Sequence, residues 1–159
     1  MSEVQRIPEG FHTLTPHIVV KNAKKALEFY QKAFGARIVT SMPVPGNDDQ
    51  LMHAEIQIGS SRLMLADEFP AWGVMGPGEA GSPVTLHLYV EDADAAMQKA
   101  VDAGAELVMP LQDMFWGDRY GKLKDPFGHS WSIAHHFADP TEEEMAAAMA
   151  ASMPGGDCG

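Results

Sequence analysis

The feature that most constrains this chain is an internal repeat. Residues 15–38, TPHIVVKNAKKALEFYQKAFGARI, follow the same plan as residues 85–107, TLHLYVEDADAAMQKAVDAGAEL. His17 matches His87 at an offset of 87 − 17 = 70 positions, and the same offset holds for four other identical pairs. Because a repeated unit of this length is one supersecondary motif, the repeat predicts two similar modules that share one core.

Local signals in the first copy predict the order strand, helix, strand, strand, strand. Asn22 is the expected N-cap of the helix, and Gly35 is expected to end it as a left-handed C-cap. Polar and apolar residues alternate over 51–58, which predicts a strand with two different faces. The expected elements are strands over 14–20, 37–44, 51–58 and 62–66, a helix through Ala33, and a turn-rich loop over 45–50.

The second copy repeats this order, and the two βαβββ units together predict the fold class. Its expected elements are strands over 84–90, 106–111, 119–124 and 130–136 and a helix from Asp92 to Gly104. Sheets that need cover on each face close most simply as paired curved mixed sheets around a central cavity, with the helices outside. The sequence therefore predicts an α+β fold.

Other segments complete the expected domain plan. Residues 1–13 form a lead-in, 14–67 the first module, 68–83 an inter-module loop, 84–138 the second module, 139–153 a C-terminal helix and 154–159 a disordered tail. The loop carries Trp72 and Met75, which predict either a lid over a cavity or a seal on a core edge or dimer contact. Thr141 and Glu144 form a capping box, and Met145 and Met149 in that helix are expected to dock on the body or on a second subunit.

Composition excludes several classes of partner. Asp plus Glu number 22 against 11 for Lys plus Arg, so the formal charge is −11. An acidic protein repels phosphate backbones and anionic lipids, so we expect neither nucleic acid nor membrane as a partner. The polar N-terminus and the absence of a long apolar run predict a cytoplasmic protein. The only cysteine, Cys158, lies in the Gly-rich tail, and we expect it to be solvated.

Three groups of motifs, taken in order, resemble a known family. They are HIVV (17–20) followed by AFGA (33–36), MHAEI (52–56) followed by LMLADE (63–68), and GDR (117–119) followed by DPFGH (125–129). Over residues 11–145 the chain resembles the glyoxalase, bleomycin-resistance and extradiol-dioxygenase superfamily, also called vicinal oxygen chelate proteins, and in particular its small bacterial glyoxalase-like branch. That family includes metal-dependent isomerases, dioxygenases and transferases, and also proteins that sequester a drug without chemistry, so the resemblance does not fix a reaction.

The resemblance also implies where a metal ion would bind. In metal-using relatives the first strand of each module offers His or Gln, and the last strand offers Glu. His17 and His87 occupy the first positions here, but Met64 and Ser132 stand in the places of the glutamates. Thioether and hydroxyl groups are poor ligands for such ions. We therefore expect no cofactor, the alternative being Zn, Ni, Fe or Mn held by His17 and His87.

The two histidines have other interpretations as well. They are either buried hydrogen-bonding residues that match because of common ancestry, or two ligands of a site to which His53 or Glu55 could add a third. If Ser132 faces the cavity, alternation along its strand sends Trp131 toward the helices.

The segment 113–120, DMFWGDRY, predicts one wall of a pocket for a planar ligand. Its Arg119 is expected either to hold a ligand carboxylate or to form an ion pair with Asp118 or Asp125. The predicted ligand-binding residues are His17, His53, Glu55, Met64, His87, Trp116, Arg119, Tyr120 and Ser132.

Three functions are consistent with the sequence. The first is a homodimer that binds a small, partly apolar, aromatic or cationic molecule in a central cavity without a catalytic metal. The alternative is a metal-dependent lyase, isomerase or dioxygenase that uses His17 and His87. The third is a scaffold or regulatory partner whose cavity is filled.

Overall fold

A computed structural model describes residues 3–153 and confirms the α+β fold of two βαβββ modules. The first module comprises β1 (His17–Val20), α1 (Ala23–Phe34), β2 (Arg37–Val44), β3 (Asn47–Ile58) and β4 (Ser61–Asp67). The second comprises β5 (Thr85–Tyr89), α2 (Ala93–Asp102), β6 (Glu106–Asp113), β7 (Asp118–Lys124) and β8 (Ser130–His136). The connection holds a short 3₁₀ helix, η1 (Pro70–Trp72), and α3 (Glu142–Ser152) follows the second module.

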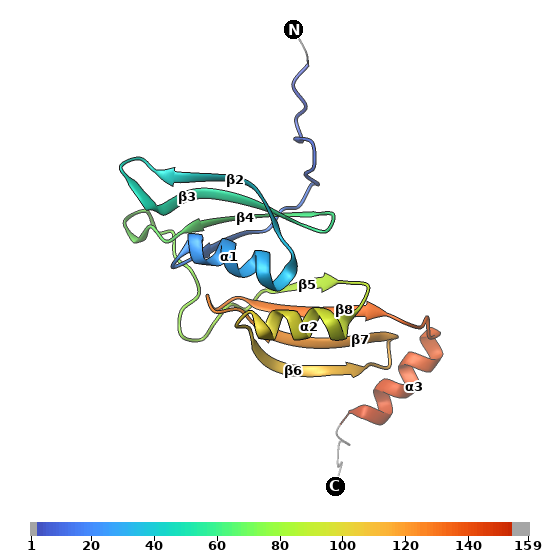
Figure 1. Ribbon diagram of the computed structural model, residues 1–159. Helices are drawn as coiled ribbons and strands as arrows, with labels where there is room; N and C mark the ends of the chain where they lie inside the picture. Colours follow the sequence, from blue (N-terminus) through green and yellow to red (C-terminus); the bar gives the residue numbers. More distant parts are fainter. Residues whose placement is uncertain (1–2, 154–159) are drawn as a thin grey trace.

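The two sheets have the same topology. Their strand orders are β1-β4-β3-β2 and β5-β8-β7-β6. In the first sheet β1 runs parallel to β4, and in the second β5 runs parallel to β8. His17 lies opposite Met64, and His87 lies opposite Ser132, in the register of these parallel pairs. Residues that match in the sequence repeat, such as His17 and His87, therefore occupy equivalent positions in the two sheets. Figure 1 shows α1 and α2 lying in front of the two sheets, and these helices contact each other.

The helix caps form as the sequence predicts. The Asn22 side chain accepts a hydrogen bond from the Lys25 N–H, and the Asp92 side chain accepts one from the Ala95 N–H. Gly35 ends α1 with φ of 66°, a left-handed conformation that glycine adopts without strain.

The β2–β3 connection differs from the prediction. The expected loop over 45–50 is wrong, because Val44 already pairs with Asn47 and only Pro45 and Gly46 form the turn. Gly46 has φ of 82°, which suits a tight hairpin. The polar run 47–50 resembles a loop in sequence because this end of the hairpin is mostly exposed and needs no apolar face.

One hydrophobic core joins the modules. Helix α1 of the first module places Phe34 against Trp131 of the second, with ring centroids 4.5 Å apart. The Tyr30 hydroxyl donates to Asp125 across the same boundary at 2.7 Å. Burial, reinforced by the Asp125 charge, raises the pKa of Tyr30 well above its ordinary value. Trp131 packs against Tyr30 and Phe34 of α1 and so faces the helices, as alternation predicts.

The C-terminal helix stands away from the body. Thr141 caps it by accepting from the Glu144 N–H, but none of the α3 residues 142–152 is buried, and Figure 1 shows the helix leading outward. Docking of its methionines on the body of the same chain is therefore not what the structure shows. The predicted disordered tail, with Cys158, lies outside the described residues.

The connection between the modules is also open to solvent. Trp72 is 68% exposed, which contradicts a core-edge seal by this side chain. Within residues 3–153 no helix has the length and apolar character needed to cross a membrane.

Candidate functional site

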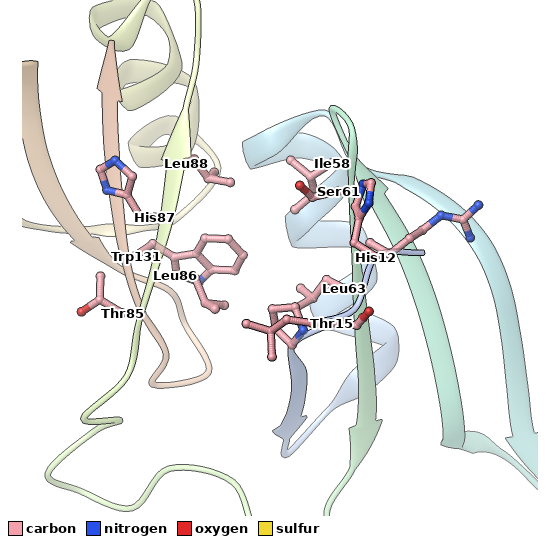
Figure 2. A pocket seen from close by; sticks show the side chains of 13 residues that line it. His12, Thr15, Ile58, Ser61, Leu63, Thr85, Leu86, His87, Leu88 and Trp131 are labelled. Carbon is pink, nitrogen blue, oxygen red and sulfur yellow. The ribbon is translucent and has the colours of Figure 1, made fainter. Parts of the chain in front are cut away.

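A hollow of about 250 Å³ lies between the two modules. In Figure 2, Leu86, Leu88 and Trp131 face Ile58 and Leu63 across it. His87 follows the opposite alternation, and its ring lies on the far side of β5 from this gap (Figure 2). Apolar residues that face the core therefore form part of the wall of the hollow, and polar residues such as His12, Ser61 and Arg62 also line it. Most of the predicted site residues, in contrast, lie on the open faces of the two sheets.

Four rings gather on the open face of the second sheet, and we call His87, Tyr89, Trp116 and Tyr120 the aromatic wall. His87 packs edge-on to Tyr89, with centroids 4.6 Å apart, and stacks with Tyr120 at 5.8 Å. Trp116 packs edge-on to Tyr120 at 5.7 Å. Such pairs add to the stabilisation that comes from burial alone.

Asp118 binds two rings of the aromatic wall through hydrogen bonds. Its side chain is buried, and its Oδ2 atom accepts hydrogen bonds from the Tyr89 hydroxyl at 2.9 Å and from the Trp116 Nε1–H at 3.2 Å. Its Oδ1 atom lies 2.7 Å from His136 Nδ1. Burial alone would raise the pKa of Asp118, but these hydrogen bonds outweigh it and hold the pKa below its ordinary value.

The backbone before Asp118 makes this arrangement possible. Gly117 has φ of 97°, which allows the chain to turn between Trp116 and β7. A Cβ atom at this position would collide with the Ala138 carbonyl. The Gly117 carbonyl also accepts from the N–H groups of Phe137 and Ala138, so the turn is tied to the segment after β8.

His87 is held as a neutral ring. Its Nδ1 atom lies 2.6 Å from the Ser132 hydroxyl on the neighbouring strand. Burial lowers the pKa of His87 below its ordinary value, against the opposing influence of the Asp118 charge. At pH 7 the side chain therefore offers a flat apolar face and one hydrogen-bonding nitrogen rather than a charge.

The remaining predicted residues form a polar cluster on the open face of the first sheet. His17 stacks on His53 with centroids 5.9 Å apart, and His53 Nε2 lies 3.1 Å from Glu55 Oε1. The other Glu55 oxygen is 3.8 Å from the Arg62 guanidinium. Met64 lies between His17 and Glu55 in the sheet register.

The Arg119 side chain lies on neither of the two open sheet faces. Its guanidinium binds Asp94 of α2 through two hydrogen bonds of 2.8 and 2.9 Å, and it also contacts Asp113 at 3.1 Å. The predicted ion pair with Asp118 or Asp125 is therefore wrong in its partners. Alternation explains the result, because Arg119 points to the helix side of β7 and Tyr120 to the open side.

The residues at the family's metal positions do not fit a metal ion. The four positions offer imidazoles from His17 and His87, a thioether from Met64 and a hydroxyl from Ser132. The Ser132 hydroxyl and one nitrogen of His87 already bind each other. Within residues 3–153, no three His, Cys, Asp or Glu side chains converge as metal ligands would. This donor set offers two imidazoles and no carboxylate, which is fewer than the three protein ligands of a catalytic zinc site.

Three residues of the site, Tyr89, Asp118 and His136, were not among the predicted ligand-binding residues. Tyr89 follows from alternation with His87, which places both side chains on one face. Alternation with Ser132 likewise places His136 on the open face. It does not reveal that Tyr89 and His136 both bind Asp118, because those contacts join β5, β7 and β8.

Comparisons with known proteins agree with this architecture. The family described as Glyoxalase/Bleomycin resistance protein/Dioxygenase superfamily matches residues 10–133. An uncharacterized protein of Mycobacterium tuberculosis is 42% identical over 146 residues, covering 89% of this chain and 85% of the relative.

Solved structures show the same likeness. An Arabidopsis thaliana protein is 31% identical with a TM-score of 0.64, covering 78% of this chain and 98% of that one. TioX from Micromonospora sp. ML1 is 25% identical with a TM-score of 0.63, covering 79% and 99% of the respective chains. FosX from Listeria monocytogenes, solved with Mn(II), is 14% identical with a TM-score of 0.59 and covers 86% of this chain and 95% of its own, so it shares the fold alone.

Proposed function

Because the chain belongs to the Glyoxalase/Bleomycin resistance protein/Dioxygenase superfamily, and because Met64 and Ser132 replace metal-binding carboxylates, we propose that it binds a small organic molecule without a resident metal ion. The observation that carries the proposal is the aromatic wall, in which ordered rings on an open sheet face rest on the buried carboxylate of Asp118. In this proposal the aromatic wall binds a ligand and takes no part in metal chemistry.

The chemistry of the wall favours a planar ligand. Aromatic faces stack on flat apolar groups, and Tyr and Trp rings also attract cations that approach their faces. The neutral His87 adds a stacking surface without an opposing charge. Because the chain carries a formal charge of −11, a cationic ligand is attracted over a longer range than an anionic one. The preferred ligand is therefore a planar, partly apolar molecule that is neutral or cationic.

The active unit in this proposal is a homodimer. Both sheet faces that carry predicted site residues are open in the single chain, and Tyr89 is 65% exposed. Exposed apolar surface of this kind is typical of an interface between subunits. A second copy would cover such surface and shield the ligand from water.

Binding of a planar cation to purified variants tests the proposal. Proflavine is a suitable probe, titrated against wild type, His87→Ala and the control Val4→Ala, which changes an exposed residue of the lead-in. Removal of His87 should weaken binding by about 1 to 3 kcal/mol through lost stacking and hydrogen bonding. The control should bind as wild type does. Absence of binding to wild type would contradict the proposal.

Metal analysis provides a second test. We expect protein purified without chelator and without metal-affinity resin to carry less than stoichiometric metal. Stoichiometric Zn, Ni, Fe or Mn in wild type that is lost in His87→Ala would overturn the proposal. That outcome would instead support a metal-dependent lyase, isomerase or dioxygenase.

A further inference from the structure

Asp118 has a role that goes beyond closing a turn. We infer that Asp118 is a positioning residue, which sets the orientation of the Tyr89 and Trp116 rings before a ligand arrives and does not itself touch the ligand. The inference rests on the proposed function of the aromatic wall. It is carried by one buried carboxylate oxygen that accepts hydrogen bonds from both rings.

The Tyr89 and Trp116 rings need these hydrogen bonds to keep one orientation, because both rings are partly exposed to solvent. Tyr89 lies at the end of β5, and Trp116 lies in the loop before β7. An exposed side chain samples several rotamers, and a ligand that selects one of them loses affinity in ordering it. One buried oxygen that accepts from both rings can therefore order them in the unliganded protein.

His136 keeps the Asp118 carboxylate ionised. Its Nδ1 atom lies 2.7 Å from Asp118 Oδ1, and its Nε2 atom lies 2.7 Å from Asp139 Oδ1. Ionised carboxylates only accept hydrogen bonds, so this geometry favours the imidazolium form of the ring, in which both nitrogens donate. The buried negative charge is thus paired with a positive one, which offsets the cost of its burial.

The groups around the pair come from several elements. Tyr89 of β5 and Trp116 of the loop donate to Asp118, while Asp139 of the segment before α3 faces the other side of the imidazolium. Arg119, the next residue of β7, points to the opposite face of the strand, where Asp94 and Asp113 neutralise it. His136 is therefore the cation that balances Asp118.

The test compares variants that remove the tether with one that preserves it. Tyr89→Phe keeps the ring but removes the hydroxyl, so proflavine affinity should fall about fivefold. Asp118→Ala should reduce it by about tenfold or more. Asp118→Asn retains one oxygen that can accept from both rings, so its affinity should stay within about twofold of wild type. The matched control, Asp113→Asn, changes an exposed carboxylate outside the wall and should have no effect.

A second readout separates positioning from general structural support. In Asp118→Asn the amide no longer stabilises an imidazolium, so the pKa of His136 measured by NMR should fall while affinity is kept. An Asp118→Asn variant as weak as Asp118→Ala would overturn the inference. So would wild-type affinity in Tyr89→Phe, which also decides the matter if Asp118→Ala does not fold.

Ligand-free measurements keep this inference distinct from the proposed function. Aromatic ¹³C relaxation should show ordered Tyr89 and Trp116 rings in wild type, and greater motion of the ring at position 89 in Tyr89→Phe. If proflavine does not bind wild type but the rings behave in this way, the proposed function fails and the role of Asp118 stands. Equal ring order in wild type and Tyr89→Phe would refute the role of Asp118 whatever the probe does.

Discussion

At the scale of single residues, buried carboxylates link different elements of the fold by accepting hydrogen bonds from more than one of them. Asp67 accepts from the backbone N–H groups of Ala23 and Leu51, and so joins α1 to β3. Asp125 accepts from the Tyr30 hydroxyl and the Trp131 indole N–H, among other donors. Both are satisfied within the core, as buried charges must be. Asp118 differs because the groups it binds face an open surface.

The protonation of His136 should be visible in the stability of the protein. Its hydrogen bond to Asp139, and then that to Asp118, raise the pKa of His136 above its ordinary value. A group whose pKa is raised by folding contributes stability that is complete below its unfolded pKa and is lost as pH rises through the folded pKa. The difference in free energy of unfolding between wild type and His136→Ala should therefore be larger near about pH 6 than near about pH 9.

Urea unfolding at a series of pH values measures this difference. His12→Ala serves as the control, because it removes an exposed histidine of the lead-in. A difference between wild type and His136→Ala that stays constant from acid to alkaline pH would show that the ring is not charged in the folded protein.

At the scale of elements, two helix caps of similar chemistry stabilise very different helices. Asn22 caps α1, which buries six side chains, whereas Thr141 caps α3, none of whose residues 142–152 is buried. Asn22→Ala should lower the free energy of unfolding by about 1 kcal/mol. Thr141→Ala should lower it by no more than a few tenths of a kcal/mol and reduce helicity instead, because a short isolated helix adds little to global stability. Urea unfolding and circular dichroism of dilute protein check both values.

A Thr141→Ala loss as large as that of Asn22→Ala would contradict this expectation. It would mean that α3 is packed in solution against a surface that the single chain does not provide.

The elements themselves could largely be predicted, since their signals are local. The caps at Asn22 and Asp92 and the alternation along β3 each depend on a few neighbouring residues. The β2–β3 hairpin was the exception, because a polar exposed strand such as the start of β3 lacks the apolar alternation that marks a strand.

The site could be predicted only in part. Alternation indicates which residues share a sheet face, and the structure does place His87 and Tyr120 together. It cannot indicate how two sheets lie relative to each other. That placement depends on α1 packing its rings against Trp131 of the second module. Likewise, the partner of Arg119 is a helix residue 25 positions earlier, Asp94, which no local pattern identifies.

At the scale of the whole molecule, the shared core and the open sheet faces have one consequence. Contacts across the module boundary, such as the 2.8 Å approach of His129 Nε2 to the Val19 carbonyl, hold the two sheets together as one unit. The core side of each sheet is therefore already covered within the chain, and only the opposite faces remain for a ligand or a second subunit.

Self-association is the expected outcome. Trp72 on η1, Tyr89 on β5 and Met149 on α3 are each more than half exposed, and a monomer that exposed them would leave much apolar surface in water. Sedimentation equilibrium at micromolar concentration should give twice the 17.2 kDa chain mass, since closed twofold dimers are the commonest assembly. Trp72→Ser should weaken the dimer, whereas Val4→Ser, which changes an exposed apolar residue of the lead-in, should not. A wild-type species of 17.2 kDa would refute the dimer.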